Sequence, residues 1–117
     1  MATIKSYTDL EQSKKLAEFL SFKSADMHYE RAYFEGKQSD WFVKLGSPIK
    51  SDDILPCWSL AALLSVLPKV INNETLFIET SLALWHIGYR NIYTARADNL
   101  VDACYELILK LNELKML

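Results

Sequence analysis

The sequence predicts an α+β fold, in which a mostly antiparallel sheet of three to five strands is packed by a buried core helix and an amphipathic C-terminal helix. Three patterns support this prediction: an apolar run bracketed by prolines, a stretch with the alternation of strands, and a last segment with helical spacing. The chain has 117 residues, enough for one domain and too few for two. We therefore expect a single domain over residues 1–117.

The most informative stretch is the run from Ser59 to Leu67, which is apolar on nearly every side and lies between Pro56 and Pro68. A short helix that is apolar all round has no face to offer to water. We therefore expect it to be the central core helix, covered by the rest of the chain.

A first helix is expected to begin at Thr8. Thr8 and Glu11 have the spacing of a capping box, in which each side chain accepts a hydrogen bond from the backbone N–H of the other. Apolar residues then recur on one face of the helix. We expect it to end near Leu20 or Ser21.

The segment from residue 24 to residue 51 carries weaker signals. It is rich in aromatic side chains and is broken by Gly36 and Gly46, and Trp41 to Leu45 has the character of a short strand. We expect irregular chain here with one or two short strands. Residues 47–56, which hold two prolines, are expected to form an exposed connection into the core helix.

The second half of the chain predicts three antiparallel strands and a helix. The strands are expected at Leu76–Ile78, Leu84–Tyr89 and Ile92–Ala95, with either a turn or a bulge at residues 81–83. Asp98 or Asn99 is expected to cap the final helix. Its apolar positions keep helical spacing for about four turns: Leu100, Cys104, Leu107, Ile108, Leu111 and Leu114.

Composition limits the possible partners. The chain has 13 basic and 15 acidic residues, a net charge of -2, whereas proteins that bind nucleic acid through phosphates usually have a basic excess. Met1 to Ser6 lack the apolar core of a signal peptide, and no apolar run approaches the ~20 residues that cross a bilayer. We therefore expect a cytoplasmic protein that contacts no membrane. Cys57 and Cys104 lie far apart and among apolar neighbours, which favours buried free thiols.

Two strings carry a resemblance to other proteins: residues 56–68, with Pro56-Cys57-Trp58-Ser59-Leu60 at their start, and residues 97–106 around Ala97-Asp98-Asn99. Together with Ser24-Ala25-Asp26-Met27 they resemble a group of small uncharacterised proteins encoded by prophages and mobile elements of gut bacteria. Members of that group commonly have proline where this chain has Leu100. The resemblance implies a bacterial intracellular origin and brings no activity or catalytic residues.

Cys57 is the best candidate for a catalytic nucleophile. A thiol just before a helix can have a lowered pKa, and His28 or His86 could act as its base. However, apolar residues surround Cys57 in the sequence, which favours a structural role. The two histidines share no ligand spacing with each other or with a cysteine, so we expect no metal site.

Other catalytic patterns have simpler structural explanations. Asp52-Asp53 lies in a loop, and Asp98 with Asp102 lies at a helix start, so neither pair needs to be an acid and base. The chain has no glycine-rich phosphate loop, and we expect no cofactor. The order of helix, three strands and helix from about Ser59 onward is that of double-stranded-RNA-binding domains, but acidic residues stand where those domains carry lysines.

The remaining unusual feature is the density of aromatic residues before the core helix. Some of these residues must fill the core beside Trp58, and any that stay on the surface would suit a protein interface. The candidate binding residues are Tyr29, Tyr33, Phe34 and Trp41, followed by Phe42.

We therefore expect a small cytoplasmic protein of a phage or mobile element, most simply a non-enzymatic module that binds a protein partner or a second copy of itself. The alternatives are a small enzyme with a site near Cys57 and an RNA-binding domain.

Overall fold

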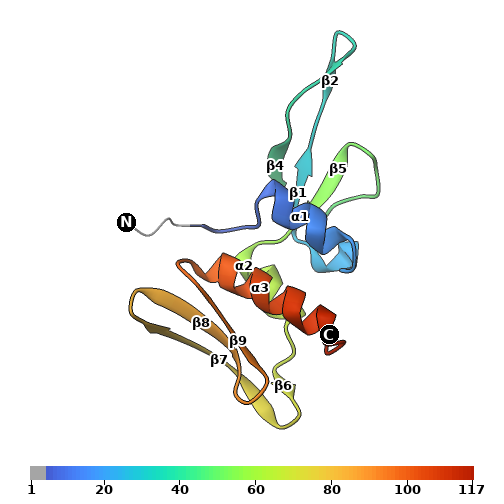
Figure 1. The fold of residues 1–117 in the computed structure, drawn as a ribbon. Coiled ribbons are helices and arrows are strands. Elements are labelled where there is room, and N and C mark those ends of the chain that lie inside the picture. The colour runs from blue at the N-terminus through green and yellow to red at the C-terminus, as the bar shows by residue number, and fades with distance from the viewer. Residues whose placement is uncertain (1–4) are drawn as a thin grey trace. The chain divides into compact units, whose positions relative to one another are not determined.

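The computed structural model describes residues 5–117 and has the predicted α+β fold, with helices and antiparallel sheets (Figure 1). Residues 1–4, part of the segment on which the signal-peptide expectation rests, lie outside the described residues. The chain divides into two compact units, Tyr7–Ala62 and Leu63–Leu117 together with the chain start. The division falls within helix α2, and the single domain expected from the length stays a prediction.

The unit Tyr7–Ala62 is built on a three-stranded antiparallel sheet in the order β4-β1-β5, and helix α1 packs against β5. Its elements are α1 (Leu10–Ala17), the 3-10 turn η1 (Phe22–Ser24), β1 (Met27–Glu30), β2 (Tyr33–Phe34), β3 (Lys37–Gln38), β4 (Phe42–Leu45) and β5 (Ile54–Cys57). The predicted strand at Trp41–Leu45 is confirmed as β4. The segment from residue 24 to residue 51 is more regular than predicted, because four short strands form there.

Strand register divides this sheet into two faces. Met27 pairs with Leu45 and Cys57, and Tyr29 pairs with Val43 and Leu55, so these side chains share one mainly apolar face. The intervening residues of β1 point to the opposite face. Deeply buried side chains of this unit include Leu16, Ala25, Met27, Cys57 and Trp58.

The prediction that Thr8 caps the first helix is wrong by one residue. Asp9 is the N-cap, and the capping box joins Asp9 to Gln12. Thr8 is fully buried, and its hydroxyl contacts Ser13 and accepts a hydrogen bond from the backbone N–H of Trp58. Because both Thr and Asp are good caps, tertiary packing of Thr8 decides the register. The helix also ends earlier than predicted, at Ala17.

The expected exposed connection at residues 47–56 is wrong in its last part, which forms strand β5. Arg31 N donates to Asp53 O at 3.1 Å, and hydrogen-bonded pairs alternate along an antiparallel ladder. Pro56, paired with His28, therefore occupies a position whose backbone nitrogen faces away from β1. Proline is tolerated at such a position of an edge strand.

Helix α2 (Leu60–Val66) confirms the predicted helix but not its expected burial on all sides. Ser59 Oγ accepts a hydrogen bond from Ala62 N at 3.2 Å, as an N-cap does. Leu63 is fully buried, whereas Ala61 and Ser65, one turn apart, are exposed. Small residues can occupy a solvent-facing position without exposing much apolar surface, so an apolar composition overstates the burial of this helix.

The second unit carries a four-stranded antiparallel sheet in the order β6-β7-β8-β9, covered on its apolar face by the C-terminal helix α3. Its elements are β6 (Val70–Ile71), β7 (Glu74–Ser81), β8 (Leu84–Tyr89), β9 (Tyr93–Ala97) and α3 (Leu100–Glu113). The three predicted strands are confirmed as β7, β8 and β9, and a turn at residues 82–83 follows Ser81, the last residue of β7. Asn99 caps α3, as predicted.

The buried face of α3 packs on the inward side chains of β8 and β9. Tyr89 is fully buried in this core; its hydroxyl donates to Pro68 O, and burial raises its pKa to about 12. The other fully buried side chains of this unit include Leu63, Ile87, Val101, Ala103, Cys104, Leu107, Ile108 and Leu111.

Candidate functional site

The aromatic segment forms a β-hairpin that extends beyond the three-stranded sheet of its own unit (Figure 1). We call residues 31–41 the arm. Its tip is a two-residue turn at Glu35 and Gly36, whose φ angles of 50° and 75° lie in the left-handed region. This geometry matches the right-handed twist of paired strands, and the glycine accepts it without strain.

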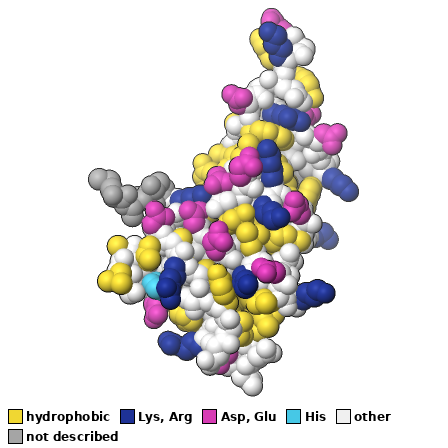
Figure 2. All heavy atoms as spheres, viewed as in Figure 1, with side chains coloured by type: hydrophobic (Ala, Val, Ile, Leu, Met, Phe, Trp, Pro, Cys, Tyr) yellow, Lys and Arg dark blue, Asp and Glu magenta, His cyan; other side chains and the backbone are white. Residues whose placement is uncertain are grey.

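The tip presents two aromatic side chains to solvent. Tyr33 is 60% exposed and Phe34 is 76% exposed. Tyr33 pairs with Gln38, whose amide donates to the Tyr33 hydroxyl at 2.7 Å, and Phe34 pairs with Lys37. Figure 2 shows hydrophobic side chains at the end of the arm beside basic and acidic ones. Tyr33 and Phe34 are therefore among the aromatic residues that stay on the surface rather than fill the core.

The base of the arm is tied to the sheet through Arg31. Its backbone N–H and its side-chain Nε both donate to Asp53, each at 3.1 Å. On its other side the guanidinium lies over the Trp41 ring, 4.5 Å from the centroid. Trp41 is half-buried and forms part of this support rather than of the exposed tip. Asp53, considered above as one of a catalytic pair, is an ion-pair partner.

A one-residue change of register separates the arm from the sheet. In the sheet Glu30 pairs with Phe42, and in the arm Tyr33 pairs with Gln38. Two residues lie between Glu30 and Tyr33 but three lie between Gln38 and Phe42, so the returning strand of the hairpin has one extra residue. Ala32 and Ser39 belong to the arm register, because Ser39 N donates to Ala32 O at 2.7 Å and Ser39 Oγ accepts from Ala32 N at 2.8 Å. Asp40 and Trp41 thus both stand opposite Arg31, as in a β-bulge, a device that bends a hairpin and increases its twist.

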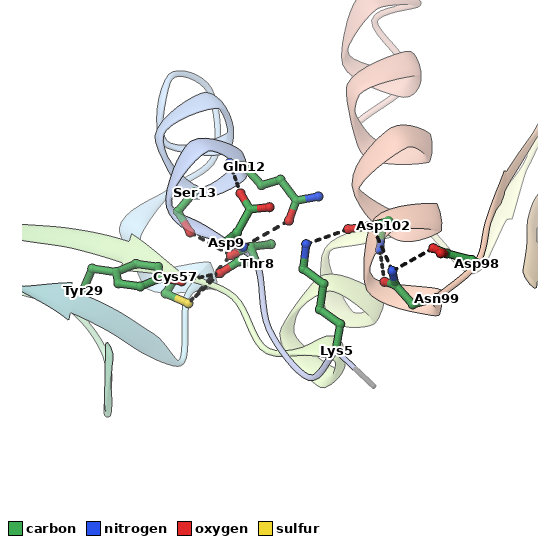
Figure 3. A network of polar contacts seen from close by, with 10 residues as sticks. All are labelled: Lys5, Thr8, Asp9, Gln12, Ser13, Tyr29, Cys57, Asp98, Asn99 and Asp102. Carbon is green, nitrogen blue, oxygen red and sulfur yellow. Dashed lines mark hydrogen bonds and ion pairs between the residues drawn. The ribbon is translucent and has the colours of Figure 1, made fainter. Parts of the chain in front are cut away.

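Tyr29 has a different setting from the residues at the tip. Its hydroxyl donates to Thr8 O at 2.8 Å, and burial raises the pKa of this phenol. The same carbonyl faces the Cys57 thiol, with the sulfur 3.5 Å away, as Figure 3 shows. Tyr29 therefore joins β1 to the chain before α1, and it is a structural residue of the unit.

The candidate nucleophile Cys57 lies inside this buried cluster and is not exposed. Burial raises the pKa of its thiol, which lowers the fraction of reactive thiolate. Cys57 pairs with Met27, so His28, the next residue of β1, points to the opposite face of the sheet. His86 belongs to the other unit. The sequence-based idea of a cysteine and histidine dyad therefore has no geometric support from His28.

His28 belongs instead to a polar row on the outer face of the sheet. Its Nδ1 lies 2.8 Å from Gly46 O and its Nε2 lies 3.4 Å from Glu30 Oε2. Lys44 Nζ approaches the same Glu30 oxygen at 3.3 Å. The hydrogen bond from Lys44 holds the pKa of Glu30 below its ordinary value.

The second histidine, His86, lies on β8 of the other unit, where its Nε2 contacts Ser81 Oγ at 3.1 Å.

The acidic residues at the start of α3 form a helix cap. Asn99 Oδ1 accepts from Asp102 N, and Asn99 Nδ2 donates to Asp102 Oδ2, both at 2.8 Å (Figure 3). Lys5 Nζ pairs with the other Asp102 oxygen at 2.8 Å, and Asp98 accepts from the Asn99 amide at 3.2 Å. The first of these contacts satisfies the backbone N–H of Asp102, one of the donors that the first turn of a helix leaves without an intrahelical partner. Asp98 and Asp102 thus stand at the helix start, where double-stranded-RNA-binding domains carry lysines.

Residues 5–117 contain neither a cluster of metal ligands nor a helix that could span a membrane. Over this range, no group of three or more His, Cys, Asp or Glu side chains could hold a metal ion. No helix in the same range is long and apolar enough to cross a membrane. Both cysteines are free and buried, which confirms the prediction for Cys57 and Cys104.

Comparisons with known protein families, with curated proteins and with solved structures give no significant match. Tyr33 and Phe34 were singled out from the sequence as members of an aromatic segment. The Glu35-Gly36 pair between Tyr33-Phe34 and Lys37-Gln38 is the signal that could have identified their hairpin.

Proposed function

We propose that this protein is a non-enzymatic binding module that contacts a protein partner through Tyr33 and Phe34 at the tip of the arm. The observation that carries the proposal is the exposure of Phe34, 76%, on a hairpin whose base is anchored by Arg31. Aromatic side chains supply a large share of the binding energy at protein interfaces.

The anchored base supports this role because it lowers the entropic cost of binding. A free two-stranded hairpin is marginally stable in water, and ordering it on binding would consume part of the interaction energy. The contacts of Arg31 with Trp41 and Asp53, and those of Ala32 with Ser39, hold the arm in one conformation before a partner arrives. Glu35 and Lys37 flank Phe34 and would form a polar rim around the aromatic contact.

The cellular setting is part of the same proposal. The resemblance to small proteins of prophages and mobile elements supports a bacterial host, and the two free, buried cysteines suit a reducing cytoplasm. In that setting the protein would act as an accessory factor on a bacterial or phage protein.

Capture from a bacterial lysate tests this function with matched variants. Phe34→Ala and Tyr33→Ala remove the aromatic tip, whereas Leu82→Ala removes a side chain that is 95% exposed on the β7–β8 turn. The proposal predicts one protein that is captured by the wild type and by Leu82→Ala and is lost with both arm variants. Equal capture by all four proteins, with unchanged circular dichroism, would remove the arm as the binding site.

A further inference from the structure

The three-stranded sheet has two edges that differ in their capacity to pair. On β5, Pro56 has no backbone N–H to offer, and Ile54 N already donates to Ser51 O at 3.3 Å. Proline and occupied donors are typical of an edge that resists further pairing. The edge at β4 contains no proline and only one charged residue, Lys44.

The hydrogen-bond alternation fixes which groups of β4 face outward. Gly46 N donates to Asp26 O at 3.0 Å, so Lys44 and Phe42 are the residues whose backbone groups face β1. The N–H and C=O groups of Val43 and Leu45 therefore face away from the sheet. Within residues 5–117, the structure gives these outward groups no hydrogen-bond partner.

We propose that β4 pairs antiparallel with β4 of a second copy of this chain, with the two-fold axis at Val43. A two-fold interface presents the same surface from both copies, so each contact occurs twice. In this register Phe42 lies opposite Lys44 of the second copy, and Leu45 lies opposite Trp41 of the second copy. Two three-stranded sheets thereby join into one continuous sheet.

The side chains favour this register. Leu45 is 84% exposed, and pairing with the Trp41 ring of the second copy would cover it. Lys44 Nζ lies 5.7 Å from the Phe42 ring centroid of its own chain, and the dimer offers it a second aromatic face. Cross-strand pairs of this kind stabilise antiparallel sheets.

The neighbouring registers are less favourable. An axis at Lys44 would set two lysines directly opposite each other, where like charges repel. An axis at Phe42 would carry the pairing beyond Trp41 to Asp40 and Ser39, across the whole bulge, where the ladder is interrupted. The pairing is short, so we expect a dimer that dissociates on dilution rather than an obligate one.

This interface is separate from the arm tip, so the two proposals can fail independently. Leu45→Pro removes the outward N–H of Leu45, whose side chain contributes little to the core. The hydrogen bonds of Phe42 and Lys44 with β1 do not involve this N–H and remain. Ile49→Ala, at a residue 69% exposed beyond the strand, is the matched control. Sedimentation over a concentration series should show reversible dimerisation of the wild type and Ile49→Ala, and at least a tenfold weaker association of Leu45→Pro, with unchanged circular dichroism.

Cross-linking tests the register without relying on the proline variant. Val43 is the one residue of β4 that meets itself across the proposed axis, so Val43→Cys should form a disulfide-linked dimer under mild oxidation, because Cα atoms of a paired position lie about 5.5 Å apart. Lys44→Cys should form far less, and the native cysteines are buried. A wild type that is monomeric at all concentrations, or equal cross-linking through positions 43 and 44, would overturn the proposal.

Discussion

The guanidinium carbon of Arg31 lies 4.5 Å from the centroid of the Trp41 ring, and the same side chain donates to Asp53 at 3.1 Å. These three residues lie on three adjacent strands or strand extensions, so one side chain connects the base of the arm to the whole width of its sheet. A mobile aromatic tip would bind at a larger entropic cost, and Arg31 is therefore central to the proposed function.

Replacing Arg31 should loosen the arm. Arg31→Ala removes the aromatic contact and the ion pair, and it should lower the free energy of unfolding by roughly 1–2 kcal/mol. Arg31→Lys keeps the charge but loses the planar guanidinium, so its loss should be intermediate. The readout is amide hydrogen exchange at Ser39, whose N–H donates to Ala32 O. Unchanged exchange at Ser39 in both variants would show that Arg31 does not hold the arm.

Two adjacent leucines of helix α2 differ in burial and should therefore differ in their contribution to stability. Leu63 is fully buried and Leu64 is only partly buried, so Leu63→Ala should cost roughly 2–5 kcal/mol and Leu64→Ala clearly less. Denaturant unfolding of both variants measures the difference. Equal losses of stability would mean that the two leucines are packed alike, and this would contradict the difference in burial between Leu63 and Leu64.

The turn between β7 and β8 holds its central residues in an unfavourable conformation. Leu82 and Ala83 have φ angles of 52° and 63°, whereas Asn72 and Asn73, a residue type suited to this region, form the β6–β7 turn. Replacing both residues, by Leu82→Asn and Ala83→Gly, should therefore stabilise the protein by about 1 kcal/mol. Thermal unfolding is the measurement, and a lower midpoint in the double variant would refute the assigned turn geometry.

Alkaline pH should destabilise the protein through Cys104. Burial raises the pKa of this thiol from its ordinary value of 9.0 to about 12. The unfolded chain loses the proton first, so the stabilising contribution is complete below pH 9 and is lost as pH rises toward 12. At pH 10 the loss amounts to roughly 1 kcal/mol. Between pH 8 and pH 10 the free energy of unfolding should fall less for Cys104→Ala than for the wild type. Equal falls in the two proteins would contradict the raised pKa of the Cys104 thiol.

The sequence predicted the elements whose periodicity is strong. Strand β8 alternates, and α3 combines a capping asparagine with a helical apolar stripe, so local pattern and tertiary packing agree there. The start of α1 was misplaced because Thr8 and Asp9 are both good caps, and only the buried contacts of Thr8 select between them. Strand β5 was missed because Pro56 looks like a loop residue until its place on a sheet edge is known.

The candidate site could be predicted only in part. The concentration of aromatic residues before α2 identified the segment, but Tyr29, Tyr33 and Trp41 are chemically similar and have different roles in the structure. Whether such a residue is buried depends on partners far away in the sequence, such as Thr8 for Tyr29 and Asp53 for the Arg31 that covers Trp41. Local composition contains no information on these partners.

The most direct test of the proposed function is photo-cross-linking in cells from the tip of the arm. A photoreactive phenylalanine analogue placed at position 34 should form one predominant adduct with a single protein, while the same analogue at position 82, which is also highly exposed, should not form that adduct. Loss of the position-34 adduct in a Tyr33→Ala background would further assign it to the aromatic tip. The absence of any adduct specific to position 34, in cells where the protein is folded and expressed, would contradict a protein-binding role for the arm.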